Sequence, residues 1–126
     1  PESHRLAGRT RVKLTDLAGE RLVVPPRGRP HREMLAALLR SANVSWEVAL
    51  EANGWELMLS FVAMGAGVAV VNACCRLPAG VVAIALPELP VLRYHCFHLR
   101  GLAKSTPAGD LRAALQDHGN AWKTST

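Results

Sequence analysis

A cluster of basic side chains in the segment PRGRPHR is the first feature of the sequence that could do chemistry. Its members are Arg27, Arg29, His31 and Arg32. They lie between an apolar stretch and a helix-like repeat, where free backbone N–H groups and the helix dipole favour an anion. Asn53 and Asn72 each follow a further apolar stretch. This pattern predicts a site for a small anionic ligand, and the alternative is a set of solvent-facing loop residues.

Thiol and imidazole groups offer a second possibility, a metal site. The residues concerned are Cys74, Cys75, His95, Cys96 and His98. Their spacing includes no C-x-x-C or H-x-x-x-H pattern, and His95 and His98 point to opposite faces of the strand expected there. A disulfide between neighbours is strained. We therefore expect buried structural thiols, no metal and no cofactor.

Catalysis finds little support in the residue pattern. No G-x-S-x-G elbow or helix-borne His pair is present. We expect a protein that is not an enzyme, and the alternative is a small enzyme that uses Cys74 or Cys96 as its nucleophile. The odd number of cysteines and the polar first residues, which do not resemble a signal peptide, indicate a cytoplasmic protein.

The charge of the chain does not indicate a nucleic-acid surface. Fifteen basic and ten acidic residues give a net charge of +5, but the basic residues are scattered along the chain. Aromatic residues make up only 5% of the sequence, which disfavours the stacking platforms of single-stranded nucleic-acid binders.

Hydrophobic periodicity predicts the elements that position these side chains. The expected elements of the first half are a helical turn over 15–19 capped by Thr15, a strand over 21–25, a helix over 29–42, a half-exposed strand over 46–51 and a helix over 54–64 capped by Asn53. Pro30 fits the first turn of its helix, and Asn43 is expected to end that helix.

The segment ELMLSFVAMGAGVAVVN, residues 56–72, has three possible interpretations. A membrane span is disfavoured by the two Gly, the Ser and the Asn that interrupt it. A phosphate-binding glycine loop follows a strand and opens a helix, whereas here the order is reversed. The change from helical to β-branched character instead predicts that a helix ends at Gly65 and a buried strand follows over 68–71.

The second half of the chain predicts strands and one last helix. Strands are expected over 80–86 and 93–100, and a helix begins at Thr106-Pro107 and carries Leu111, Ala114 and Leu115. The tail from Gly119 is expected to fray. The order of elements predicts an α/β fold with a mostly parallel sheet that is covered by helices on both faces.

The ordered series of segments resembles a known family. LTDLAGERLVVPPRG, VALEANGWELMLSFVAMGAGVAVVN, LPAGVVAIAL and STPAGDLRAAL resemble the effector-binding domain of LysR-type bacterial transcriptional regulators. The resemblance covers about Arg11 to Leu115. It implies one half, mainly the second subdomain, of a two-subdomain fold like that of type II periplasmic binding proteins. A solute-binding protein of a transport system, which shares the fold, is the alternative.

The resemblance also implies site residues and partners. The effector contacts that the family implies for this sequence are Pro26, Arg27, Gly28, Ala52, Asn53, Gly54 and Asn72. Arg29 of the basic loop is added to this set as their neighbour. Gly54 stands where the family often has Ser, and Asn72 where it usually has Pro. The implied ligand is a small, anionic metabolite. DNA would be bound only through an N-terminal helix-turn-helix that this sequence does not contain, and no membrane is involved.

The resemblance finally implies a division of the chain. Residues 1–10 are a lead-in after the first crossing strand, 11–92 the second subdomain, 93–119 a returning strand and helix, and 120–126 a tail. In the family, a side-by-side dimer forms through the helix expected over 29–42 and its neighbouring strand. The apolar faces near Tyr94 to Leu99 and near Leu111 are expected to fold back or to pair with another copy.

Overall fold

A computed structural model describes residues 1–97 and 107–123. The chain divides into two compact units, Pro1–Pro90 and Val91–Thr126. The first unit contains a 3₁₀ turn (η1), two strands and two helices. The second contains the helix α3.

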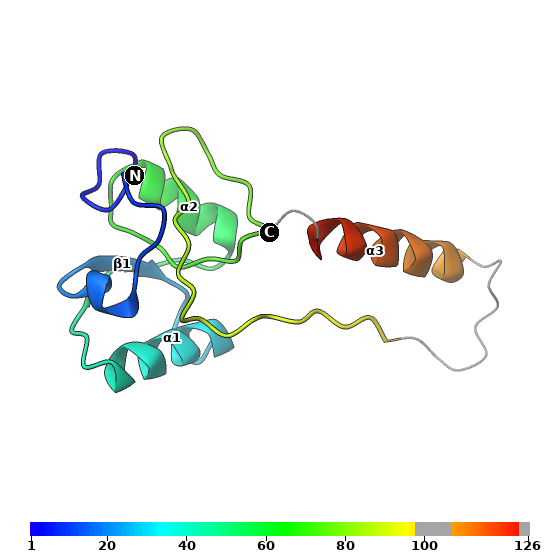
Figure 1. Ribbon diagram of the computed structural model, residues 1–126, viewed down its shortest axis with the longest axis horizontal. Helices are drawn as coiled ribbons and strands as arrows, with labels where there is room; N and C mark the ends of the chain where they lie inside the picture. The colour runs from blue at the N-terminus through cyan, green and yellow to red at the C-terminus, as the bar shows by residue number, and fades with distance from the viewer. Residues whose placement is uncertain (98–106, 124–126) are drawn as a thin grey trace. The chain divides into compact units, whose positions relative to one another are not determined.

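Strand β1 (Arg21–Val24) is the centre of the first unit (Figure 1). It pairs in parallel with β2 (Glu47–Glu51), and helix α1 (Pro30–Ser41) connects the two strands. On its other side β1 meets Val68: the Val23 N–H donates to the Val68 carbonyl at 2.8 Å, and the Val68 N–H donates to the Arg21 carbonyl at 3.0 Å. The sheet is therefore parallel, and β2 lies at its edge as expected.

Helix α2 (Trp55–Ala63) ends where the glycine pattern predicted. Gly65 has a φ of 79°, the left-handed conformation that terminates helices, and the chain then turns back to pair at Val68. The predicted end of the helix at Gly65 is confirmed, whereas the buried strand expected over 68–71 is reduced to a single bridge at Val68. Among the described residues, no helix combines the length and the apolar character needed to cross a bilayer.

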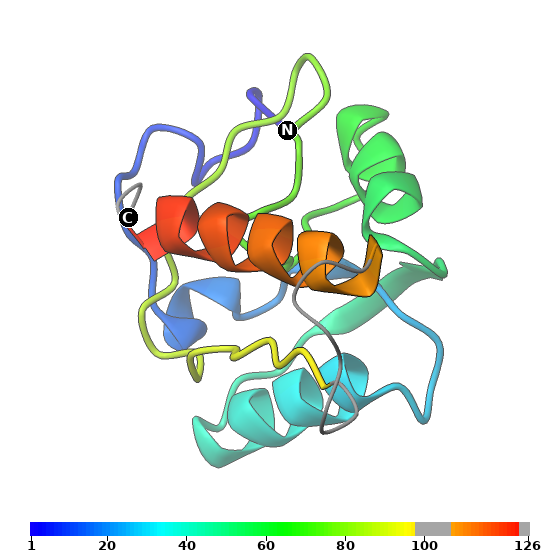
Figure 2. The same ribbon diagram turned by 90° about the vertical axis from the view of Figure 1, so that its right-hand side faces the viewer.

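The core consists of two clusters, one on each face of the sheet. Leu22 and Val24 of β1 face the cluster that contains Leu35 and Leu39 of α1. Val23 faces the opposite cluster, formed mainly by Met58, Leu59 and Val62 of α2 together with Val81. All three β1 residues have no exposed surface, so this strand is covered on both faces. Figure 2 shows α1 and α2 on either side of the two strands.

The later predicted strands are not formed. The segment expected to be a strand over 68–71 makes one bridge, at Val68, and the one expected over 80–86 makes one bridge, between Ala85 and Arg11. Residues 93–97 are not in a strand, and 98–100 lie outside the described residues. A strand forms where a neighbouring segment supplies backbone hydrogen-bond partners along it, and each of these segments has such a partner at a single residue. The side chains of Val81, Ile84 and Leu86 nevertheless pack against the core.

Both predicted side-chain caps are wrong. The N-cap of α2 is Gly54, with a φ of 102°, so Asn53 stands one residue too early to cap the first turn. Turn η1 (Leu14–Leu17) begins one residue before Thr15, and its cap position is Lys13. The Asp16 carboxylate accepts the Lys13 N–H at 2.8 Å and the Arg9 guanidinium at 2.8 Å.

These contacts make Asp16 a pH-dependent contributor to stability. The Lys13 N–H, followed by Arg9 and Arg5, holds the pKa of Asp16 below its ordinary value of 3.8. The contribution is therefore present above that value and is lost as the pH falls through the lower pKa of the folded state.

We expect Asp16→Asn to lower the free energy of unfolding at neutral pH by an amount that shrinks at acid pH. Urea unfolding followed between about pH 3 and pH 7 measures this difference. Glu51→Gln, at an exposed position of β2, controls for the loss of one acidic charge from a basic chain. A difference that stays constant over the whole range would contradict the assignment.

Helix α3 (Pro107–Lys123) confirms the last predicted helix. The cap residue Thr106 lies outside the described residues. The helix continues past Gly119, so the prediction of a frayed tail from that residue is wrong. Apolar side chains of this second unit are exposed at Val91, Leu92, Tyr94, Phe97, Leu111 and Leu115.

Candidate functional site

The candidate site lies at the edge of the sheet where the strands end. Because β1 and β2 are parallel, the loop after Val24 and the loop after Glu51 leave the sheet on the same side. The extended segment that begins at Val68 runs in the same direction beside β1 and reaches Asn72 at this edge. In open α/β sheets, ligands collect at this edge. We call these three segments, 25–31, 52–55 and 70–72, the carboxyl edge.

The imidazole of His31 connects the three segments of the carboxyl edge. Its Nε2 lies 2.8 Å from the carbonyl oxygen of Val70, and since a carbonyl only accepts, Nε2 carries the proton. The ring also makes an edge-to-face contact with Trp55, with 4.7 Å between ring centroids and 88° between planes. The first turn of α1, the first residue of α2 and the start of the third segment therefore meet at one side chain.

The basic loop is a tight turn with its guanidinium groups outward. The Arg29 N–H donates to the Pro26 carbonyl at 3.3 Å, and Gly28 has a φ of 80°, as glycine allows in a type II turn. Arg27 and Arg29 are exposed, while Pro26 is half-buried. Pro30 occupies the first turn of α1, as predicted. This turn holds two positive charges at the carboxyl edge.

One amide of this loop is already occupied. The Gly28 N–H donates to Glu33 Oε1 at 2.9 Å, a bond between the loop and the first turn of α1. Glu33 thereby takes a donor that an incoming anion could use. The Gly28 N–H is therefore engaged. An anionic ligand at this edge would pair with the guanidinium groups of Arg27 and Arg29 instead.

The remaining predicted residues fall into two groups. Asn53 and Gly54 are exposed beside the first turn of α2, and Asn72 is half-buried, with its carbonyl accepting the Cys75 N–H at 3.1 Å. Ala52 is only 4% exposed and donates its N–H to the Val24 carbonyl at 2.9 Å. Its methyl group belongs to the core, so Ala52 contributes shape to the edge and no ligand-binding group.

Arg32 does not join the other basic residues. It is 6% exposed, and its Cζ lies 4.5 Å from the centroid of the Trp46 ring, away from the carboxyl edge. Its Nη1 is buried and has no hydrogen-bond partner among the described residues. The stacked indole stabilises the guanidinium through its π face. The sequence pattern grouped Arg32 with the loop, but its guanidinium stacks on Trp46, whereas His31 contacts Val70 and Trp55.

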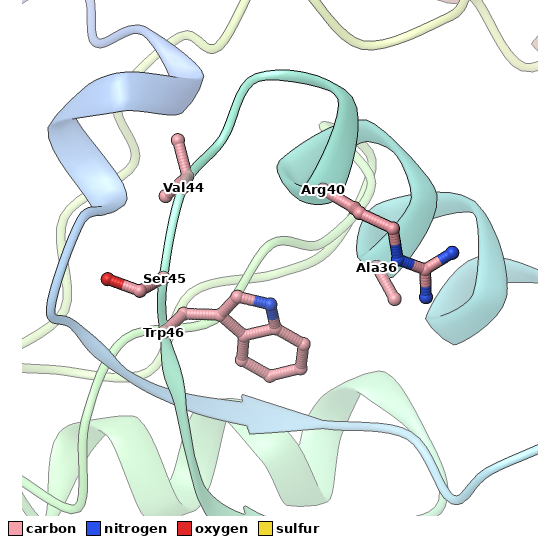
Figure 3. A pocket seen from close by; sticks show the side chains of 5 residues that line it. All are labelled: Ala36, Arg40, Val44, Ser45 and Trp46. Carbon is pink, nitrogen blue, oxygen red and sulfur yellow. The ribbon is translucent and has the colours of Figure 1, made fainter.

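Two surface hollows lie elsewhere. One, of about 330 Å³, is lined by Ala36, Arg40, Val44, Ser45 and Trp46, and Figure 3 shows the Trp46 indole facing the α1 side chains across it. The other, of about 470 Å³, is lined by Arg9, Arg11, Val12, Lys13, Asp16, Pro87 and Glu88. The two hollows share no residue with the carboxyl edge.

The cysteines differ from the sequence prediction. Cys74 and Cys96 are exposed and Cys75 is half-buried, and all three are free thiols. The expectation of buried structural thiols is wrong for Cys74 and Cys96, whereas Cys75 packs against the core cluster on the α2 side of the sheet. Among the described residues, no group of three His, Cys, Asp or Glu side chains could hold a metal ion.

Trp55 and the contacts of His31 are the parts of the site that sequence reasoning missed. His31 was noted in the basic cluster without a contact to the other segments, and Trp55 was interpreted as part of the apolar repeat of α2. A usable signal was available: each residue lies in the first turn of a helix that follows a parallel strand. The contact between them depends on how the two helices sit on opposite faces of the sheet.

The fold and the carboxyl edge define a class, the α/β ligand-binding domains with loops at the ends of parallel strands. A family model described as "LysR substrate binding domain" matches residues 1–120. The chain therefore belongs to the LysR substrate-binding domain family, the effector-binding part of LysR-type transcriptional regulators. No curated protein and no solved structure matches the chain. The small parallel sheet with helices on both faces is compatible with part of the two-subdomain fold that this membership implies.

Proposed function

We propose that the carboxyl edge binds a small anionic metabolite and that the chain is the sensing part of a LysR-type regulator. The observation that carries the proposal is the meeting of three loops at His31, with Arg27 and Arg29 exposed beside it. A ligand carboxylate or phosphate pairs with these guanidinium groups, since Glu33 occupies the Gly28 amide. Asn53 and the Asn72 side chain add polar contacts, and Gly54 leaves room because it has no side chain.

Sensing requires that the ligand favour one conformation of the intact protein. In the full effector-binding domain, a second subdomain faces the carboxyl edge. A ligand that contacts both subdomains stabilises the arrangement in which they are closed on each other. The closed arrangement changes the oligomer and thereby the helix-turn-helix modules that contact DNA. In this proposal the protein is a cytoplasmic homodimer without enzymatic activity, and it touches DNA only through those modules.

The proposed dimer contact uses α1 and the edge strand β2. Strand β2 has β1 as its one partner in the described sheet, and Val48 on it is 43% exposed. An open edge with an exposed apolar side chain is suited to a second copy. The exposed apolar residues of the second unit, such as Phe97 and Leu111, are in this proposal covered by the other subdomain of the effector domain.

The test is Arg27→Ala in the intact regulator. A thermal-shift screen of small mono- and dicarboxylates and sugar phosphates first identifies a ligand that stabilises the unsubstituted protein. Loss of one charge-assisted hydrogen bond should then weaken its binding by roughly 10- to 100-fold, measured by calorimetry, while promoter affinity without ligand stays the same.

Arg21→Ala is the matched control for this test. Arg21 is exposed at the opposite end of β1, so its loss removes the same charge away from the carboxyl edge. Ligand affinity should be unchanged in this variant. Equal weakening in both variants would show a general charge effect, and an unchanged affinity in Arg27→Ala would refute the anion site.

A further inference from the structure

The turn after Asn72 carries two adjacent thiols. The Cys75 N–H donates to the Asn72 carbonyl at 3.1 Å, which folds residues 72–75 into a tight turn. Cys74 is exposed, and Cys75 is half-buried against the α2-side core cluster. One sulfur is thus open to solvent, while the neighbouring residue is anchored to the core.

The side chains of the two cysteines also interact with each other. Burial raises the pKa of the Cys75 thiol, and the adjacent Cys74 side chain, which is hydrogen-bonded to it, raises the pKa further. Cys75 is therefore a neutral thiol at physiological pH, which is not the state of an activated nucleophile. The two thiols nevertheless stand on consecutive residues of one hydrogen-bonded turn, as a ligand that bridges both would require.

We propose that Cys74 and Cys75 form a dithiol site for monosubstituted trivalent arsenicals, a class of ligand distinct from the proposed effector. Such a compound, R–As=O, reacts with two thiols. Two S–H bonds break, two As–S bonds form, and the oxygen leaves as water with both protons. Arsenic remains trivalent, so the step needs no oxidant or reductant.

The number of sulfur donors selects this class of ligand. A structural zinc ion takes four ligands, and the described residues contain no group of three candidate ligands. An arsenic atom that already carries one carbon substituent needs only two sulfur ligands. Cys96 is a single exposed thiol of the second unit, and it can offer only one bond.

An arsenical that is bound by both thiols should not be removed by a competing monothiol. Once one As–S bond has formed, the second thiol is at a high effective concentration, because it is on the next residue. The hydrogen bond of the turn and the packing of Cys75 reduce the cost of bringing the sulfurs together. Binding would cross-link the turn that begins at Asn72, next to the carboxyl edge.

Phenylarsine oxide is the probe that tests the proposal. The chain, kept reduced by a phosphine, is mixed with the probe and then with excess glutathione, and intact mass is recorded. We expect the chain and its Cys96→Ser variant to retain one phenylarsenic group with two hydrogens lost. A dithiol such as dimercaptopropanol should remove it. Cys74→Ser should lose retention, and because Cys74 is exposed this change leaves the core intact.

A free peptide covering residues 70–79 tests whether the fold contributes to the site. It contains both cysteines without the packing of Cys75, and we expect it to bind the probe about 10-fold more weakly than the folded chain. Retention by Cys74→Ser, release of the probe to glutathione, or equal affinity of peptide and chain would each overturn the proposal. None of these results depends on whether the carboxyl edge binds an effector.

Discussion

Gly67→Ala should lower the free energy of unfolding by about 3 kcal/mol. An added Cβ at this position would overlap the carbonyl oxygen of Arg21 and would stand 3.3 Å from the Cβ of Ala49. The carbonyl belongs to the central strand and accepts the Val68 N–H, so neither side can yield easily. The chain must move away from β1, and the two hydrogen bonds that join Val68 to Arg21 and Val23 weaken together.

Chemical unfolding in urea, followed by circular dichroism, measures this loss. Gly8→Ala is the control, because nothing lies within 4 Å of a Cβ built there. Its effect should stay within about 0.5 kcal/mol, as for most surface changes. Similar losses in the two variants would mean that the third segment does not lie against β1 as described.

Met58→Ala should destabilise the chain by about 2 to 5 kcal/mol, because it leaves a cavity between α2 and the sheet. Met58 is 1% exposed and packs in the cluster on the α2 face of β1. The change removes buried apolar surface, and the surrounding side chains can only partly fill the space.

The neighbouring residue supplies a control in the same helix. Leu57 is 48% exposed, so Leu57→Ala should cost less than about 1 kcal/mol. The same unfolding experiment compares the two variants. If Leu57→Ala were the more damaging substitution, the face of α2 assigned to the core would be wrong.

Local patterns predicted the helices well. The three- and four-residue spacing of apolar side chains located α1 and α2 to within one or two residues, and Gly65 marked the end of α2. These features depend on neighbours a few positions away in the chain. The caps were less predictable, since a shift of one residue in the start of α2 moved Asn53 out of the capping position.

The candidate site was only partly predictable. Its loops follow from the order of strands and helices, so the positions of Arg27, Asn53 and Asn72 could be proposed before the fold was known. Two residues are placed by tertiary contacts that the pattern does not reveal: Ala52 is held in the core, and Arg32 is turned towards Trp46. The contact that joins the loops, through His31, was not visible in the sequence.

Membership of the family, the helices, the parallel order of β1 and β2 and the loops at their ends all follow from local sequence patterns. Tertiary structure decided which apolar segments became strands, which basic side chains reached the carboxyl edge, and how exposed Cys74 and Cys75 are. The physical reason is the range of the interactions. Helical periodicity and turns arise from contacts between near neighbours, whereas a strand forms only where a distant segment supplies its hydrogen-bond partners.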